Sequence, residues 1–183
     1  MNAPAAPLSP YSSAIGKPNI EVHTLSVLVD NEPGVLARVV GLFSGRGYNI
    51  ESLTVAEVAH AEHLSRITIV TSGTPEVLEQ IRAQLGRLVP VHHVVDWTID
   101  KPGIEREMAL VKVAGSGEKR VEALRMADAF RARPVDTTHT SFVFEITGAP
   151  GKIDSFVDLM RPLGLVEVSR TGVVAISRGP EAM

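Results

Sequence analysis

The chain has 183 residues, 44% hydrophobic and 21% charged, enough for one medium or two small globular domains. Its net charge of −3 gives no reason to expect nucleic acid or an anionic membrane as a partner. The absence of cysteine excludes disulfides, thiolate zinc sites and cysteine nucleophiles.

Residues 1–20 form the first distinct segment, with four prolines among alanines and serines. The segment has neither a basic start nor the apolar run of a signal peptide, so we predict a flexible tail. No later apolar stretch is long enough to span a bilayer. Together with the lack of cysteine, this predicts a soluble cytoplasmic protein without a membrane partner.

Residues 21–98 show the pattern of a small α+β module. The stretch VHTLSVLVD, residues 22–30, is rich in β-branched residues and predicts a strand that stops at a Pro-Gly turn. Pro33 suits the first position of a helix, and apolar residues then recur at helical spacing as far as Gly45 or Gly47. We therefore predict a strand followed directly by a helix.

The rest of this module predicts a hairpin, a helix and a last strand. Strands are expected within residues 49–58 and 64–71, about the polar loop 59–63. Thr74-Pro75 signals a second helix with apolar residues as far as Leu88, and residues 91–98 a fourth strand. The resulting β-α-β-β-α-β order is that of the ferredoxin-like fold, an antiparallel sheet with helices on one face.

After a predicted linker at residues 99–104, the same order of elements returns in residues 105–183. We expect a strand, a helix, two short strands, a helix and then one or two strands. A local likeness supports two related modules: Pro33-Gly34 and Pro150-Gly151 each precede a glycine, Gly47 and Gly164, by the same spacing. A helix start, an apolar stripe and a glycine stop also produce this pattern without common ancestry.

The best candidate site is the N-terminus of the first helix. Its N–H groups and partial positive charge could receive a carboxylate, and Gly34 has no side chain to keep an anion away. The alternative is that Asn31 caps the helix and Pro33-Gly34 only makes the turn. Asn49, which starts the second strand, could lie near the same corner and add an amide for an ammonium group. Together these groups would suit a zwitterion.

Other polar residues predict no catalytic or metal site. His60 and His63 have a spacing that a metal would accept, but they fall in a polar loop with only Glu62 nearby. Scattered acids such as Asp154 have no histidine or lysine at a convincing spacing, and solvated faces explain them. We expect neither catalytic residues nor a metal.

The chain from residue 21 onward resembles the small regulatory subunit of acetolactate synthase, also called acetohydroxyacid synthase. The resemblance rests on LSVLVDNEPGVLARVVGLFSGRGYNIESLTVA, LSRITIV and LEQIRAQLGRLVPVHHV, and on the later ALVKV and VEVSRTGVVAISRG. It implies that the first module is an ACT domain, which pairs across a homodimer and binds a branched-chain amino acid, commonly valine, at the paired interface.

The resemblance also implies a set of effector-binding residues. One chain would hold the carboxylate and α-carbon end of the effector, and the neighbouring subunit would supply the rest. The first group is Asn31, Gly34, Val35 and Leu36, and the second is Asn49 and Ile50. Ala37 departs from the serine that some members carry, which leaves an extra polar contact there in doubt.

By this resemblance the chain is a non-catalytic subunit that binds a larger catalytic subunit, raises its activity and confers feedback inhibition. Thiamine diphosphate, Mg and FAD are then expected in the catalytic partner, and this chain holds no cofactor. One alternative is a free-standing ACT-type sensor that acts on another enzyme or on transcription, although no basic stripe or helix-turn-helix pattern supports DNA binding. Another is an enzyme on a ferredoxin-like scaffold, because fold does not fix function.

Overall fold

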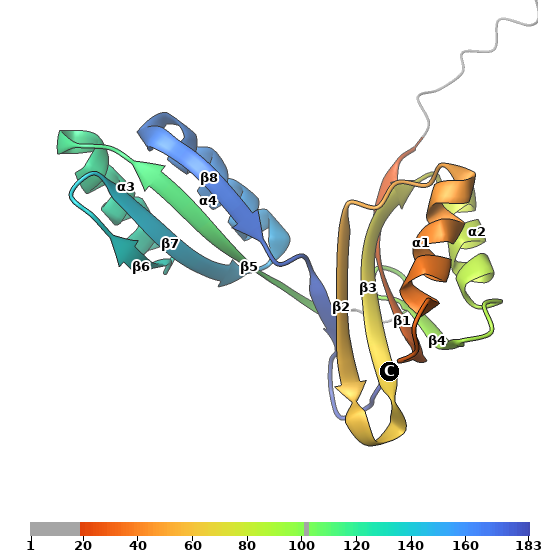
Figure 1. The fold of residues 1–183 in the computed structure, drawn as a ribbon. Coiled ribbons are helices and arrows are strands. Elements are labelled where there is room, and N and C mark those ends of the chain that lie inside the picture. The colour runs from red at the N-terminus through yellow and green to blue at the C-terminus, as the bar shows by residue number, and fades with distance from the viewer. Residues whose placement is uncertain (1–18, 101–102) are drawn as a thin grey trace, which may run out of the picture.

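The computed structural model describes residues 19–100 and 103–183, which form two α/β modules joined by extended chain (Figure 1). The predicted flexible tail, residues 1–20, falls almost entirely on residues 1–18, and the centre of the predicted linker is residues 101–102. Both of these stretches lie outside the described residues. Within the described part of the chain, no helix combines the length and the apolar character needed to cross a bilayer.

The first module has the predicted ferredoxin-like topology. Its elements are β1 (Glu21–Asp30), α1 (Val35–Arg46), β2 (Ser52–Ala59), β3 (Leu64–Gly73), α2 (Pro75–Leu85) and β4 (Val91–Asp96). The strands lie in the order β2-β3-β1-β4, and each neighbouring pair is antiparallel. Alternate residues of β1, Leu25, Val27 and Val29, are buried in a core with residues of α1 and α2.

The second module repeats this order. It consists of β5 (Gly103–Ala114), α3 (Gly117–Ala129), β6 (Arg133–Thr137), β7 (Ser141–Gly148), α4 (Pro150–Gly164) and β8 (Leu165–Arg170), with strand order β6-β7-β5-β8. A further strand, β9 (Val174–Ser177), pairs with residues 103–106 of β5. The predicted α+β class, with antiparallel sheets and helices packed against them, is therefore confirmed.

Three local details differ from the sequence-based expectation. Pro33 is not the first helical residue, because the N-cap of α1 is Gly34, whose φ of +88° lies in the left-handed region that favours glycine. Leu88 lies beyond the end of α2 at Leu85. The predicted polar loop contains a short 3₁₀ helix, η1 (His60–Glu62), which ends at His63 with a φ of +50°.

The likeness between the two Pro-Gly segments does not join equivalent helices. α1 is the first helix of its module, whereas α4 is the second helix of the other. The shared signals are those of any helix that is closed by a glycine with positive φ, which is +69° at Gly47 and +106° at Gly164. The likeness is therefore no argument for duplication of one module.

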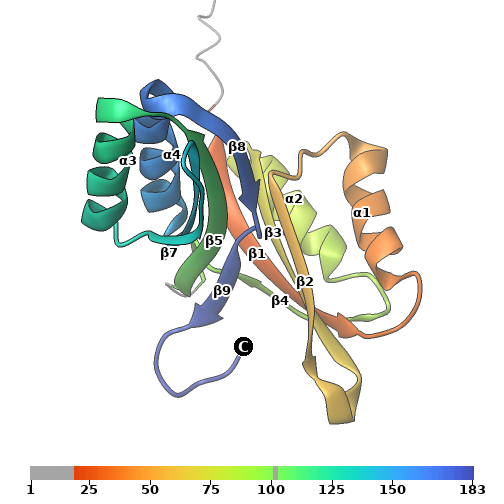
Figure 2. The same ribbon diagram turned by 60° about the vertical axis from the view of Figure 1, so that its left-hand side comes forward.

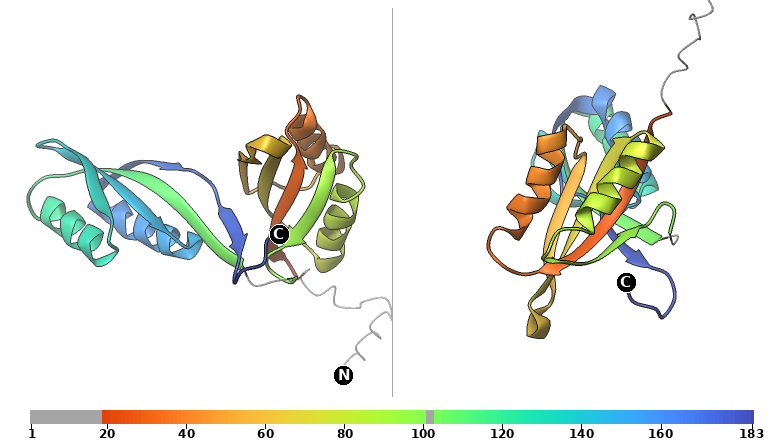
Figure 3. Two further views of the ribbon diagram at one scale, coloured as in Figure 1. Left: turned by 90° about the horizontal axis from the view of Figure 1, so that it is seen from below. Right: turned by 90° about the vertical axis from the view of Figure 1, so that its right-hand side faces the viewer.

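The modules meet on the face of the first sheet that α1 and α2 leave open (Figures 1 and 3). A ribbon of β5 and β9 carries the chain between them (Figure 2). Trp97 is only 4% exposed and clusters there with Val95, Ala175 and Met183. The indole Nε1 donates a hydrogen bond of 2.7 Å to Ser26 Oγ, on the open face of the sheet. This contact between the modules, here called the joint, thus has a small apolar core of its own.

Candidate functional site

The N-terminus of α1 carries no capping side chain and no acidic residue in its first turn. The first helical hydrogen bond of the i→i−4 kind runs from Arg38 N–H to the carbonyl of Gly34, 3.0 Å long. The N–H groups of Leu36 and Ala37 precede it and have no intrahelical acceptor. These donors and the helix dipole make this end of α1 a suitable receptor for a carboxylate.

The alternative reading, that Asn31 caps α1, is wrong. Asn31 lies three residues before the N-cap, Gly34, and makes no side-chain cap bond. Its backbone N–H donates to the carbonyl of His63, 2.6 Å away, which ties the end of β1 to the turn before β3. The side chain of Asn31 is exposed beside the helix start, so its amide is accessible to another molecule.

The predicted effector residues differ in what they can offer. Asn31, Gly34, Leu36 and Asn49 are exposed, and Ile50 is half-buried against the core of the first module. Val35, however, is only 4% exposed, with its side chain packed in that core. Val35 can therefore offer an effector only its backbone, and its place among the effector-binding residues stays a prediction.

A single chain does not bring Asn49 to the corner formed by Asn31 and Gly34. The twelve residues of α1 separate Gly34 at one helix end from Gly47 at the other, a length of about 18 Å at 1.5 Å per residue. The strand register leads to the same conclusion. Asp30 pairs with Leu64 at the start of β3, whereas Ser52 pairs with Val70 near its other end. The hypothesis of one shared corner within a chain is therefore wrong.

The backbone around Asn49 is held firmly although its side chain is exposed. Thr71, which is fully buried, donates its Oγ1 hydroxyl to the carbonyl of Asn49 at 2.6 Å. Glu51 N–H donates to the carbonyl of Val70 at 2.8 Å. The exposed amide of Asn49 therefore projects from backbone that is tied to β3, next to the start of β2.

The histidine pair of the turn after β2 forms no metal cluster. His60 Nδ1 lies 2.9 Å from Glu57 Oε1, and the His60 side chain is 91% exposed. The ring centroids of His60 and His63 are 6.4 Å apart. In residues 19–100 and 103–183, no group of three histidine, aspartate or glutamate side chains could hold a metal ion.

Two polar clusters have no clear signal in the sequence. His23 is buried and its Nδ1 lies 2.6 Å from Asp96 Oδ2, which joins β1 to β4 beside a cavity of about 740 Å³. The one signal is a histidine two residues before Leu25, on the side of β1 whose later residues, Leu25, Val27 and Val29, are all apolar. The second cluster surrounds Arg170, at the end of β8.

Arg170 joins β8 to β5 and α4. Its Nε and Nη2 donate to the two carboxylate oxygens of Glu107 at 2.7 and 2.5 Å, and Nη1 donates to Asp154 Oδ1 at 2.6 Å. Glu107 is 4% exposed, so this bidentate pair compensates a buried charge. The hydrogen bonds to Glu107 raise the pKa of Arg170 above its usual range. Asp154 is thus not the simple solvated acid that the sequence suggests.

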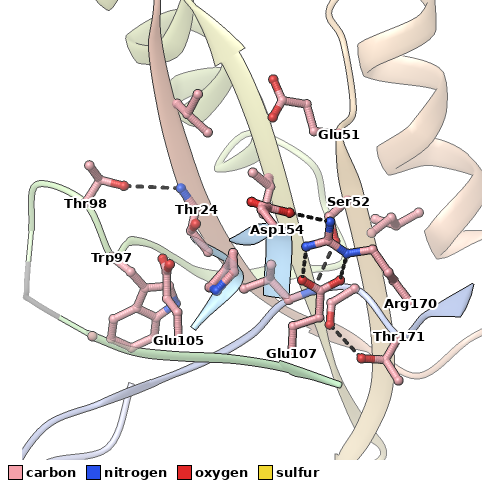
Figure 4. Close-up of a pocket in the computed structure, with 17 residues that line it drawn as sticks. Thr24, Glu51, Ser52, Trp97, Thr98, Glu105, Glu107, Asp154, Arg170 and Thr171 are labelled. Carbon is pink, nitrogen blue, oxygen red and sulfur yellow. Dashed lines mark hydrogen bonds and ion pairs between the residues drawn. The ribbon is translucent and has the colours of Figure 1, made fainter. Parts of the chain in front are cut away.

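The Arg170 cluster lines a cleft of about 990 Å³ between the modules (Figure 4). Glu51 and Ser52 border the cleft from the first module, and Glu107 and Arg170 from the second. The cleft therefore lies next to the segment that carries Asn49 and Ile50.

Comparison with known families matches both modules. Residues 25–93 match the model described as "AHAS small subunit-like ACT domain", and residues 106–179 match "Small subunit of acetolactate synthase". Together the two matches span most of the chain.

Individual relatives agree over nearly their full length. The "Acetolactate synthase isozyme 3 small subunit" of Escherichia coli is 47% identical over 160 residues, 87% of this chain and 97% of the relative. The "Probable acetolactate synthase small subunit" of Archaeoglobus fulgidus is 48% identical over 157 residues, 86% of this chain and 97% of the relative. The crystal structure of the acetolactate synthase small subunit from Thermotoga maritima is 37% identical, with a TM-score of 0.76, covering 88% of this chain and 99% of that one.

Proposed function

The chain belongs to the family of acetolactate synthase small subunits, and we propose that it activates a larger catalytic subunit and makes it sensitive to feedback by a branched-chain amino acid. In this proposal the partner holds thiamine diphosphate, Mg and FAD and performs the condensation of pyruvate with pyruvate or 2-oxobutyrate. This chain contributes binding and regulation. Its place in branched-chain amino-acid biosynthesis follows from the same proposal.

The observation that carries the effector part of the proposal is the uncapped N-terminus of α1. An amino-acid carboxylate there accepts from the N–H groups of Leu36 and Ala37, next to the helix dipole. The Leu36 side chain is 41% exposed and is available to an aliphatic effector side chain. Valine fits these requirements, but one methylene in an apolar pocket is worth only about 1–3 kcal/mol, so leucine and isoleucine are the natural competitors.

The ammonium group of the effector requires the second chain. Asn31 and Asn49 lie at opposite ends of α1 in one chain. A two-fold axis perpendicular to α1 would place the Asn49 end of one protomer beside the Asn31 end of its partner, and it would make two equivalent sites. Two protomers paired in this way complete each site that one protomer leaves open.

We therefore expect a homodimer in solution. Light scattering at micromolar concentration should give about twice the chain mass of 19.6 kDa, with or without valine. A monomer under both conditions would contradict the shared site, because neither chain alone can bring Asn31 and Asn49 together.

The function is tested by reconstitution with the catalytic subunit from the same organism. We expect the small subunit alone to form no acetolactate from pyruvate, to stimulate the catalytic subunit, and to make the complex inhibitable by valine. Feedback inhibition then requires that valine binds more tightly to the arrangement of the small-subunit dimer that activates the catalytic subunit less well. Binding of valine without any effect on the synthase would instead support the free-standing sensor, and turnover by the small subunit alone would support an enzyme.

A further inference from the structure

Residues 170–173, here called the bridge segment, are held tightly by the second module. Arg170 is bound by Glu107 and Asp154 as described above. Thr171 N–H donates to the carbonyl of Met108 at 3.0 Å, and Met108 N–H donates back to Thr171 Oγ1 at 3.1 Å. The bridge segment therefore moves with β5 and α4 as one body.

The far end of the bridge segment touches β2 of the first module. Val173 is 5% exposed, and its N–H donates to Ser52 Oγ at 3.0 Å. Gly172 has a φ of +85°, and a Cβ there would lie 2.8 Å from Ser52 Oγ and 2.7 Å from Thr54 Oγ1. Only glycine permits this close approach, so the contact is specific in geometry. Figure 4 shows Ser52 beside the Arg170 cluster.

Ser52 also belongs to the segment that carries the proposed effector residues. Only Glu51 separates it from Ile50, and the backbone from Asn49 to Ser52 is tied to β3 through Thr71 and Val70. Ile50 packs against the core on the helix-covered side of the sheet, whereas Ser52 faces the second module. A displacement of Ile50 on the helix-covered side of the sheet therefore also displaces Ser52 on the side that faces the second module.

The remaining joint leaves room for such a shift. A cleft of about 990 Å³ lies between the modules, so they are not packed along their whole facing surfaces. The other main contact is the cluster of Trp97 with Ala175 and Met183, next to the β5–β9 ribbon. The relative orientation of the modules thus depends on few contacts.

We infer that the hydrogen bond between Ser52 and Val173 couples effector binding at Asn49 and Ile50 to the orientation of the second module. This inference rests on the proposed function, because it needs an effector at that corner. The effector shifts the start of β2 together with the residues of β3 that hold it, Ser52 carries the bridge segment with it, and the second module turns about the ribbon.

The test measures the distance between modules with and without valine. Because the chain has no cysteine, Ser44→Cys on α1 and Ala129→Cys on α3, both exposed, give a unique pair of spin labels. Labelled chains are mixed with excess unlabelled chains so that each dimer carries one pair. We expect valine to shift the distance distribution of the parent. Ser52→Ala and Gly172→Ala should lose roughly half of this shift or more, while valine affinity by calorimetry changes less than about threefold.

Matched controls separate the contact from side effects. Ser72→Ala removes a hydroxyl from the same face of the sheet, on β3, and Gly179→Ala places a Cβ at a φ of +79° with nothing within 4 Å. Both should keep the full shift. Retention of the shift in Ser52→Ala, or loss of its valine affinity, would overturn the inference, as would a parent that binds valine without any shift. A parent that binds no branched-chain amino acid would instead reject the proposed effector function itself.

Discussion

Replacing Gly34 by Asp is expected to abolish inhibition by valine while the chain still activates the catalytic subunit. The new carboxylate would lie beside the position proposed for the carboxylate of the effector. Two like charges about 4 Å apart repel by about 4 kcal/mol at an effective dielectric near 20, which corresponds to roughly a thousandfold in affinity. Calorimetry should detect no valine binding, and the reconstituted complex should stay active at valine concentrations that suppress the parent.

The backbone at Gly34 sets the control for this experiment. Its φ of +88° is not an ordinary helical angle, and a Cβ there meets nothing within 4 Å, so the substitution costs backbone strain without a clash. Asn and Asp are the non-glycine residues that best tolerate this region, at about 1–2 kcal/mol. Gly34→Asn therefore has the same shape and strain without the charge and should retain most valine binding. Equal loss in both variants, or full sensitivity in Gly34→Asp, would remove the carboxylate from this helix end.

Replacing Arg170 by Met is expected to destabilise the second module by about 3 kcal/mol, since loss of one partner leaves a buried charge uncompensated. The orphaned group is Glu107, which is 4% exposed. The estimate is at the low end of the usual range because the Arg170 side chain is itself 37% exposed and partly screened by solvent. Urea unfolding monitored by circular dichroism measures the loss.

Two further variants identify the cause. Arg161→Met breaks an ion pair with Asp158 whose side chains are 67% and 70% exposed, and it should cost less than about 0.5 kcal/mol. Adding Glu107→Leu to Arg170→Met removes the orphaned carboxylate and should recover part of the loss. If Arg170→Met lowers the free energy of unfolding as little as Arg161→Met does, the buried charge of Glu107 does not need the guanidinium to compensate it.

The order of elements follows from local signals, which is why the sequence predicts it well. Alternation of Leu25, Val27 and Val29 marks a half-buried strand, and Gly47 marks the end of a helix. The sequence does not determine the start of α1, because Pro33-Gly34 fits both a first helical turn and a turn before the helix. Only the positive φ of Gly34 separates these readings.

Contacts between distant segments leave no such signal. Ser52 and Val173 are 121 residues apart, and Arg170 and Glu107 are 63 apart. Neither pair has a spacing that predicts a shared face. The contact between Ser52 and Val173 depends on how the modules meet, and the contact between Arg170 and Glu107 depends on how β8 pairs with β5. The same holds for Asn31 and Asn49, whose separation by α1 only the folded chain reveals. The individual candidate residues could be named from the sequence, but their division between two protomers could be inferred only from the family resemblance.

Trp97 is the only tryptophan of the chain, and it lies where the two modules touch. Indole fluorescence therefore reports on the joint alone, with no background from either module core. Its neighbours Ala175 and Met183 come from the last residues of the sequence, whereas Val95 comes from β4. The fluorescence of Trp97 in the unmodified protein thus reports on the joint. It should change when the C-terminal residues separate from the first sheet and water reaches the indole.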